Sequence, residues 1–196
     1  SRHSSLSGIP TLSVHTPGNL ATAELGGISR KVSVSPASAM RDALLEMARL
    51  RLEMGLNYQV SYECTHHGPS LDVPTMFVEL GSSPEQWKDS RAAEAVAHAA
   101  MAAISKCSVY PAVLGIGGPH YSEKFTRIAL SNPTAFGHII PKYAIPQVDS
   151  EMIRQCVDRT TEKVESALLE WKGIRGPERD RLIAILDEIG IPTERA

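Results

Sequence analysis

The sequence predicts an α/β fold, a three-layer sandwich around a mixed, largely parallel sheet. Two observations lead to this prediction. Short segments with strand character alternate along the chain with longer segments of helical spacing, which is typical of α/β proteins. One strand segment, residues 111–116, is apolar throughout, as expected for a strand buried on both faces of a parallel sheet. We therefore expect one α/β domain over residues 1–196, with C-terminal helices over residues 150–189.

The first half of the chain is expected to form four strands and two helices. The strands cover residues 11–15, 31–34, 58–64 and 75–80. Ser35 and Pro36 are typical of an N-cap and a first helical position, and Gly55 is typical of a helix end. Ser83 and Pro84 start the second helix. Small or apolar residues are expected to pack this helix against the sheet: Ala93, Ala97, Ala100 and Ile104.

The second half of the chain is expected to be richer in helix. After the strand at 111–116 come a short helix at 124–130 and a strand at 137–140. A long helix then begins at Asp149 or Ser150, with an apolar stripe that reaches Trp171. A last helix opens at residues 176–177, where Gly-Pro favours a helix start, and ends before residue 190.

Composition excludes several classes of protein. The formal net charge is −2, so any contact with nucleic acid must use a local basic patch. No apolar segment approaches the roughly 20 residues that span a bilayer, so we expect no membrane association. The cysteines, Cys64, Cys107 and Cys156, are scattered and odd in number. This pattern favours a reducing compartment and predicts a cytoplasmic protein.

Two turns that contain histidine are the most informative features of the sequence. Thr65-His66-His67-Gly68-Pro69 and Gly117-Gly118-Pro119-His120-Tyr121 each follow a predicted strand. Functional sites of open α/β sheets lie at the carboxyl ends of strands. His15 and Glu79 also lie at strand ends. We therefore expect one site assembled from segments that are distant in sequence.

The residues expected to converge there are His66, His67, His120 and Glu79, with His138 as a further member. Adjacent residues of an extended turn point in opposite directions, so at most one of His66 and His67 is expected to face the site. Taken singly, a strand-end histidine is more often a hydrogen-bonded structural residue than a ligand. The clustering of several is what favours a functional site.

Two kinds of chemistry fit such a cluster. Imidazole and carboxylate groups can bind Zn²⁺ and leave one position open for a water of lowered pKa. Alternatively, a histidine or glutamate takes a proton from water directly, while backbone N–H groups of Gly117 and Gly118 bind the oxyanion. Either route suits hydrolysis of an activated ester. The sequence contains no Gly-x-Ser-x-Gly, Walker or Gly-x-Gly-x-x-Gly motif.

Four segments resemble the archaeal and plant type of D-aminoacyl-tRNA deacylase. They are residues 65–69, 117–126, 137–143 and 12–19, and the likeness extends to about Trp171. The resemblance implies hydrolysis of the ester between a D-amino acid, or glycine, and the terminal ribose of tRNA, a chiral proofreading step in translation. It also implies zinc dependence and a fold similar to peptidyl-tRNA hydrolase and the nucleoside phosphorylases. Because the family has a further N-terminal segment, we expect this chain to be N-terminally shortened.

The resemblance and the turn chemistry together assign roles to individual residues. Catalytic roles are expected for His67, Glu79 and His120, and zinc ligation for His66, His120 and His138. Substrate binding is expected from His15, Asn19, Gly117, Gly118, Tyr121, Lys124, Thr126 and Lys142. Lys124 and Lys142, with Arg127, supply the local basic patch for the tRNA phosphates.

Three alternatives remain open from the sequence. The substrate can be a related ester such as peptidyl-tRNA. The chain can be a non-catalytic module that binds RNA or nucleotides. It can also be a metal-binding protein whose histidines contribute only stability. A monomer and a homodimer are equally compatible with the sequence.

Overall fold

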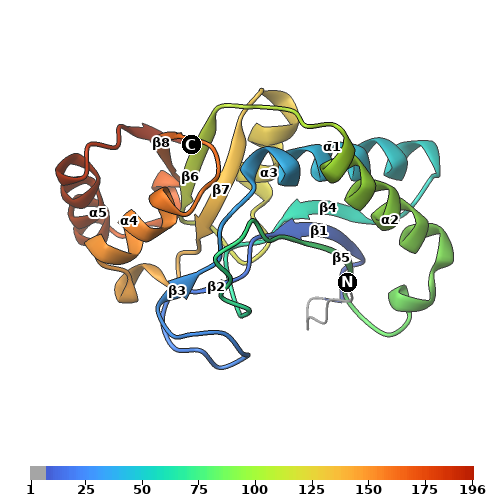
Figure 1. The fold of residues 1–196 in the computed structure, drawn as a ribbon, viewed down its shortest axis with the longest axis horizontal. Coiled ribbons are helices and arrows are strands. Elements are labelled where there is room, and N and C mark those ends of the chain that lie inside the picture. The colour runs from blue at the N-terminus through green and yellow to red at the C-terminus, as the bar shows by residue number, and fades with distance from the viewer. Residues whose placement is uncertain (1–7) are drawn as a thin grey trace.

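The computed structural model describes residues 8–196, in which strands and helices alternate (Figure 1). The strands of the first half are β1 (Thr11–His15), β2 (Gly18–Asn19), β3 (Lys31–Val32), β4 (Gln59–Tyr62) and β5 (Phe77–Gly81). Those of the second half are β6 (Ala112–Ile116), β7 (Ala135–Ile140), β8 (Val164–Leu169) and β9 (Thr193–Arg195). The helices are α1 (Ala37–Glu53), α2 (Ser90–Ser105), α3 (Glu123–Ser131), α4 (Ser150–Asp158) and α5 (Gly176–Glu188).

The strands pair in three sheets, with orders β4-β1-β5, β2-β3 and β7-β6-β8-β9. β1 pairs parallel with β4, and every pair of the four-stranded sheet is parallel. Only β1–β5 and β2–β3 are antiparallel among the described strand pairs. The prediction of an α/β fold with mixed, largely parallel pairing is confirmed.

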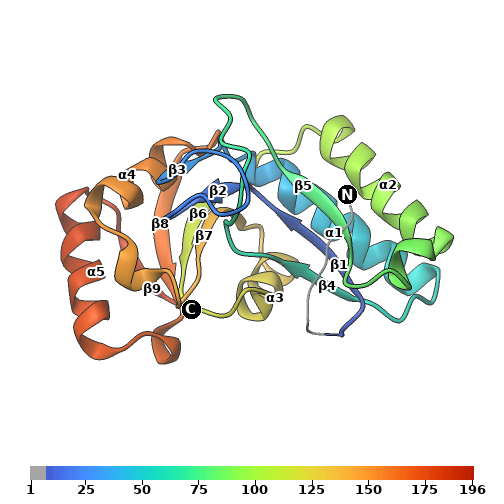
Figure 2. The same ribbon diagram turned by 90° about the horizontal axis from the view of Figure 1, so that it is seen from below.

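The four-stranded sheet is the middle of a three-layer arrangement. α1 and α3 contact β7 from one side, and α4 and α5 lie on the other (Figures 1 and 2). Side chains alternate accordingly along β6: Val113 belongs to the core cluster with α1 and α3, whereas Leu114 and Ile116 belong to the cluster with α4 and α5. α1 and α2 also cover the three-stranded sheet, so one core spans both sheets.

The chain directly after β4 links the two larger sheets. Cys64 N–H donates to the carbonyl oxygen of His120 at 2.9 Å, and Thr65 N–H donates to that of Ile139 at 2.8 Å. Glu63 forms an antiparallel bridge with Tyr121. As a result, the turn after β4, the turn after β6 and the end of β7 lie side by side.

The predicted long C-terminal helix is wrong. α4 starts as expected, with Asp149 capping Met152 N–H at 3.0 Å, but ends at Asp158. The following segment forms the buried strand β8, between β6 and β9. Its apolar residues fit helical spacing as well as a strand. Hydrogen bonding to β6 stabilises the strand over a continuation of the helix. A central strand is covered on both faces, so it has few polar residues. Leu169, for example, is 0% exposed.

The start and the buried face of α2 also differ from the prediction. The helix begins at Ser90, where the Asp89 carboxylate accepts from two backbone N–H groups. Its buried residues are Ala92, Ala95, Val96, Ala99 and Ala102. Ile104, expected in the core, is 73% exposed. Both faces of the helix are rich in alanine, so spacing alone selects the wrong one.

α1 also lacks the predicted serine cap. The carboxylate of Glu162, distant in sequence, accepts from Ala37 N–H at 3.1 Å and Ser38 N–H at 2.8 Å. This tertiary contact satisfies two of the unpaired donors that every helix start presents. Separately, none of the helices within residues 8–196 has the length and apolar character needed to cross a membrane.

Candidate active site

Four histidines from three segments form one cluster. His15 ends β1, His66 and His67 belong to the turn after β4, and His120 belongs to the turn after β6. The ring of His66 lies at the centre, with centroids 4.3 Å from His15, 4.4 Å from His67 and 4.4 Å from His120. The structure therefore brings these four predicted residues together.

Both histidines of the first turn face the cluster, in contrast to the prediction that only one would. His67 adopts a left-handed backbone conformation, with φ of +42°. This breaks the alternation of an extended chain and turns the ring to the same side as His66. The next position must be glycine, because a Cβ on Gly68 would lie 2.4 Å from the backbone carbon of Gly26. The close approach of two loops thus fixes the turn.

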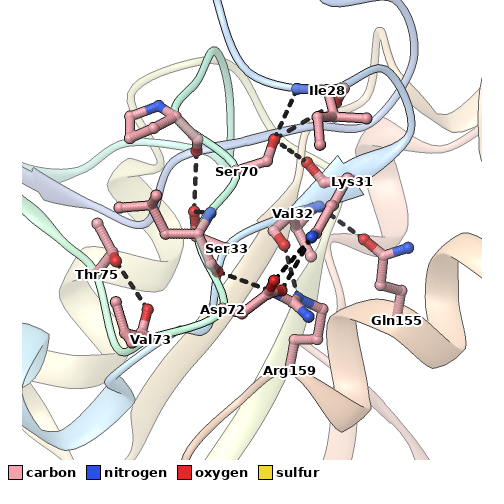
Figure 3. A network of polar contacts seen from close by, with 12 residues as sticks. Ile28, Lys31, Val32, Ser33, Ser70, Asp72, Val73, Thr75, Gln155 and Arg159 are labelled. Carbon is pink, nitrogen blue, oxygen red and sulfur yellow. Dashed lines mark hydrogen bonds and ion pairs between the residues drawn. The ribbon is translucent and has the colours of Figure 1, made fainter.

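A polar network holds the segment after this turn (Figure 3). The guanidinium of Arg159, at the end of α4, donates to the carbonyl oxygens of Val32 and Leu71, each at 2.7 Å. Asp72 binds Arg159 at 2.7 Å and Lys31 at 3.0 Å. These contacts join the end of α4, strand β3 and residues 71–72. They hold in place the segment that follows the histidine turn.

Glu63 lies beneath the histidines and was missed by the sequence analysis. Its carboxylate accepts from Ser13 Oγ at 2.5 Å and from His120 Nε2 at 2.8 Å, and it lies 3.5 Å from His66 Nε2. Its side chain is fully buried. The available signal was an acidic residue placed inside a strand, directly before a histidine turn. Buried carboxylates are rare unless they are paired, so this position indicates a role.

Burial and pairing shift the pKa values of the histidines in opposite directions. Burial acts to lower the pKa of His120, but hydrogen bonds to Cys64 and Glu63 outweigh it and raise that pKa to about 10. Burial, with the neighbouring His120, lowers the pKa of His66 to about 4. Burial also holds the pKa of His15 well below its ordinary value. At neutral pH the cluster thus combines a protonated His120 with neutral His66 and His15.

Cys64 is the buried thiol of the site. Its Sγ lies 3.4 Å from His120 Nδ1 and 3.2 Å from the hydroxyl of Tyr143. Burial, followed by the electrostatic effect of Cys64, raises the pKa of Tyr143 well above its ordinary value. Tyr143 is 56% exposed, so its ring forms part of the surface above the thiol.

His15 and Glu79 form the inner side of the cluster. Glu79 lies on β5, and its Oε2 is 3.8 Å from His15 Nδ1. Within residues 8–196, neither ring nitrogen of His15 has a hydrogen-bond partner, although the residue is only 1% exposed. The ring stacks on Phe77 with centroids 5.2 Å apart. A buried imidazole in this condition has acceptor and donor capacity that a ligand can use.

A cavity of about 260 Å³ opens beside the cluster. His66 and His67 form part of its wall, together with Tyr143 and the predicted substrate-binding residue Asn19. Asn19 Nδ2 donates to the carbonyl oxygen of Gly26 at 2.9 Å, which holds the loop that forms another part of the wall. The remaining lining residues are Gly18, Leu20, Ala21, Thr22, Glu24, Leu25, Thr65, Ala144 and Gln147.

The predicted oxyanion hole at the two glycines is not supported for Gly117. Its N–H donates to the carbonyl oxygen of Ile140 at 2.8 Å and is therefore occupied. Gly117 and Gly118 have φ of +107° and +78°, and a Cβ on Gly118 would lie 2.5 Å from Glu170 Oε2. These glycines are needed for the turn and for the close approach of Glu170.

His138 lies outside the cluster, contrary to its predicted place beside His66 and His120. It is fully buried on β7, with Nδ1 3.0 Å from Thr65 Oγ1 and Nε2 3.4 Å from the carbonyl oxygen of Arg159. Both ring nitrogens are thus occupied. Burial lowers the pKa of His138 to about 4. The geometry makes it a support behind the first turn.

Predicted substrate contacts at α3 and beside it have other partners. The ammonium of Lys124 donates to the carbonyl oxygen of Ala196. Thr126 Oγ1 accepts from Tyr62 N–H at 2.8 Å and is buried, so it holds α3 against β4. Lys142, next to the cavity residue Tyr143, is exposed and available for a ligand.

The two remaining predicted residues, Tyr121 and Arg127, lie in different surroundings. The ring of Tyr121 packs edge-on against His120, with centroids 5.3 Å apart. Arg127 lines a separate cavity of about 370 Å³, together with Arg51. Only Tyr121 therefore lies next to the histidine cluster.

Three groups of side chains within residues 8–196 could hold a metal ion. They are His15 with His66 and His67, Cys64 with His66 and His120, and His15 with Glu63 and Glu79. Within each group, one ligand atom per residue lies within 4.8 Å of the others. Nitrogen, sulfur and carboxylate donors of this kind suit Zn²⁺ and similar ions. Chemically, the site can bind a metal, accept a proton or stabilise negative charge.

Comparison with known proteins connects this site to one family. The family model described as D-aminoacyl-tRNA deacylase matches residues 1–194. The D-aminoacyl-tRNA deacylase of Pyrococcus furiosus is 43% identical over 192 residues, which cover 97% of this chain and 70% of that protein. The protein of the same name from Ignicoccus hospitalis is 37% identical over 191 residues, covering 97% of this chain and 77% of that protein.

A solved structure has the same fold. The crystal structure of a conserved protein of unknown function superimposes with a TM-score of 0.92 at 31% sequence identity. The match covers 100% of this chain and 69% of the other. The arrangement of strands that forms the histidine cluster is therefore shared with an experimentally determined structure.

Proposed function

The chain belongs to the D-aminoacyl-tRNA deacylase family, and we propose that it hydrolyses the ester bond of D-aminoacyl-tRNA. The products are the free D-amino acid and tRNA. One structural observation supports this proposal above all others. The adjacent histidines of a family motif, His66 and His67, both line a cavity beside a buried carboxylate.

The hydrogen bonds of these two rings define which nitrogen is available. Nδ1 of His66 donates to the carbonyl oxygen of Cys64 at 2.8 Å, and Nδ1 of His67 donates to that of Gly68 at 2.5 Å. Since a neutral imidazole has one N–H, each Nε2 keeps its lone pair. Such a nitrogen either takes the proton of the attacking water itself or holds a metal ion. Positioned proton transfer contributes about 10²–10⁴-fold to rate.

His120 and Glu63 supply charge at the edge of the site. His120 is protonated at neutral pH because Cys64 and Glu63 outweigh the effect of burial on its pKa. Its side chain is 32% exposed, so the positive charge reaches the surface of the cluster. Both ring nitrogens of His120 are engaged, by Glu63 and Cys64. We therefore assign to His120 a positive potential near the site, and not a direct hydrogen bond to the ester oxygen.

Zinc is the metal we propose for this family member. The donor set fits, because His15 is buried with unpaired ring nitrogens and two neighbouring imidazoles keep Nε2 lone pairs. When bound, zinc supplies a Lewis acid and a water that loses its proton near neutral pH. Around that position, the residues of the chain would bind and orient the ester and would exclude bulk water.

Substrate recognition is assigned to the walls of the cavity. Tyr143 offers an exposed ring on which a base of the acceptor end can stack, and Lys142 lies next to it for a phosphate. The loop that carries Leu20, Ala21 and Leu25 lines the same cavity as the histidines and is our candidate for the wall that rejects an L side chain.

The test compares esters of opposite chirality. Purified protein is incubated with D-tyrosyl-tRNA, L-tyrosyl-tRNA and N-acetyl-L-tyrosyl-tRNA. We expect hydrolysis of the D ester and little effect on the other two. Preferential cleavage of the N-acetylated ester would instead support a peptidyl-tRNA hydrolase, and binding of tRNA without cleavage would support a non-catalytic module.

A further inference from the structure

We infer that His15, His66 and His67 are the ligands of one divalent metal ion at the cavity wall, and that Glu79 orients His15 for this purpose. The inference rests on the proposed function for the identity of the metal, but the ligand set follows from geometry. It differs from the predicted set of His66, His120 and His138, because it replaces two of those residues.

The first observation is the condition of His15. The residue is 1% exposed, and within residues 8–196 neither of its ring nitrogens has a hydrogen-bond partner. Leaving a buried polar group unpaired destabilises the folded chain, because the group loses its hydrogen bonds to water. A metal ion bound to one of these nitrogens removes that cost and explains why a histidine occupies the end of a buried strand.

The second observation concerns the tautomers of the other two ligands. Nδ1 of His66 and Nδ1 of His67 each donate to a backbone carbonyl oxygen, those of Cys64 and Gly68. A metal-binding histidine typically donates its second ring nitrogen in this way, which fixes the ring and raises the basicity of the ligand. Both side chains are therefore already oriented for ligation through Nε2.

The third observation is the placement of the three rings. The His15 ring centroid lies 4.3 Å from that of His66 and 5.1 Å from that of His67. One nitrogen of each residue lies within 4.8 Å of the others. Zinc–nitrogen bonds of about 2.0–2.1 Å in tetrahedral geometry require nitrogens about 3.3 Å apart. Rotation of these side chains would bring the nitrogens to that separation, and the cavity that His66 and His67 line would give water or substrate access to the ion.

Glu79 completes the arrangement as a positioning residue. Its Oε2 lies 3.8 Å from Nδ1 of His15, on the strand that pairs with β1. Ligation through Nε2 places the Nδ1 proton of His15 toward this carboxylate. The result is a carboxylate–histidine–metal series, in which the outer carboxylate typically affects metal affinity by about 10–100-fold.

The two competing donor groups fit less well. In the group with Cys64, both nitrogens of His120 are engaged: Nε2 lies 2.8 Å from Glu63 Oε2, and Nδ1 lies 3.4 Å from the thiol sulfur. Ligation there requires loss of one of these contacts. The group of His15, Glu63 and Glu79 is buried in all three members, and none of them lines the cavity.

The test uses Co²⁺ as a spectroscopic probe of the ligands. The full chain is stripped with chelator and titrated with Co²⁺, and the visible d–d bands and the near-ultraviolet region are recorded. We expect one equivalent to bind, with no thiolate-to-cobalt charge-transfer band. Cys64→Ser is expected to leave the spectrum unchanged. A thiolate band that disappears in Cys64→Ser would overturn the inference in favour of the group with Cys64.

Affinity measurements on variants identify the remaining ligands. His67→Ala and His15→Asn are expected to weaken Co²⁺ binding at least 100-fold, and Glu79→Gln about 10–100-fold. His98→Ala, on the exposed face of α2, is the matched control and is expected to bind normally. Because His15 is buried, circular dichroism establishes that each variant is folded. His67 is partly exposed, so normal Co²⁺ affinity in folded His67→Ala overturns the inference even if His15→Asn fails to fold.

These measurements need no tRNA, so they separate the inference from the proposed function. Cobalt bound by the three histidines without hydrolysis of D-tyrosyl-tRNA would contradict the function alone. Hydrolysis of the D ester with unchanged metal affinity in the histidine variants would contradict the ligand assignment alone.

Discussion

The two histidine turns share glycine, proline and histidine but differ in environment. In the turn after β4, His66 and His67 line a cavity, and backbone carbonyl oxygens accept from their Nδ1 atoms. In the turn after β6, His120 is bound at Nε2 by the buried carboxylate of Glu63. The imidazole of His66 is thus neutral in the first turn, whereas that of His120 is a cation in the second. The partner of each ring nitrogen, and not the motif, decides the chemistry.

The largest expected effect is on the first turn. His67→Ala removes a lone pair at the cavity wall, and we expect the rate of D-tyrosyl-tRNA hydrolysis to fall more than 100-fold, equal to about 3 kcal/mol of barrier. Single-turnover kinetics measure this directly. His98→Ala is the control for a histidine removed from the surface. Turnover within a few-fold of the unmodified protein would return His67 to a structural role.

The second expected effect tests the charge pair of the other turn. Glu63→Gln removes the charge that faces His120, and we expect a loss of about 3 kcal/mol in the free energy of unfolding at pH 7, as for other broken buried pairs. The ordinary pKa of histidine is about 6.5, and that of His120 is about 10 in the folded chain. The stabilisation from His120 is therefore complete below pH 6.5 and declines as the pH rises toward 10.

Denaturant unfolding across that pH range checks this prediction. The protein with Glu63 should lose stability between pH 7 and pH 10, whereas Glu63→Gln should show a flatter profile. Parallel profiles would mean that the pair does not hold the His120 charge.

The third expected effect concerns the support behind the first turn. His138 is buried with a pKa of about 4, below the ordinary value of about 6.5. The unfolded chain therefore binds a proton that the folded chain rejects, and stability falls as the pH drops from about 6.5 to about 4. The full shift corresponds to about 3 kcal/mol. Denaturant unfolding of the protein and of His138→Gln should show a smaller acid loss in the variant. Equal losses would place the acid sensitivity elsewhere.

The smallest expected effect lies at the surface. Lys142 is exposed beside the cavity, whereas Lys124 binds the carbonyl oxygen of Ala196. We expect Lys142→Ala to weaken tRNA binding slightly and to reduce the salt slope by about one unit. Lys124→Ala is the matched comparison and should leave the slope unchanged. A reduced slope in Lys124→Ala alone would restore the original prediction for that lysine.

The sequence predicted the parts of the site that depend on turn chemistry and strand order. The Gly and Pro residues predicted the positions of both turns. Because functional sites lie at strand ends, the sequence also predicted that His15, His66, His67 and His120 lie close together. The positive φ of His67 was not predictable from an alternation rule, and it reversed the orientation of one ring. Spacing also could not distinguish β8 from a helical continuation of α4, because the pairing partner that decides between them lies some 50 residues away in β6.

Tertiary contacts account for the other differences. Glu63 was missed because its role depends on Ser13 and His120, which come from distant segments. The placement of His138 depends on Thr65 and on the carbonyl oxygen of Arg159, which no local pattern encodes. Local sequence thus identified the residue types of the site, and packing assigned their partners.

The contrast between the two turns is tested most directly by the protonation states of the histidine rings. A long-range ¹H–¹⁵N correlation spectrum at pH 7 reports which ring nitrogens bear protons. We predict that His66 is neutral with its proton on Nδ1, and that His120 is protonated on both nitrogens. A neutral His120 or a protonated His66 at that pH would contradict this prediction.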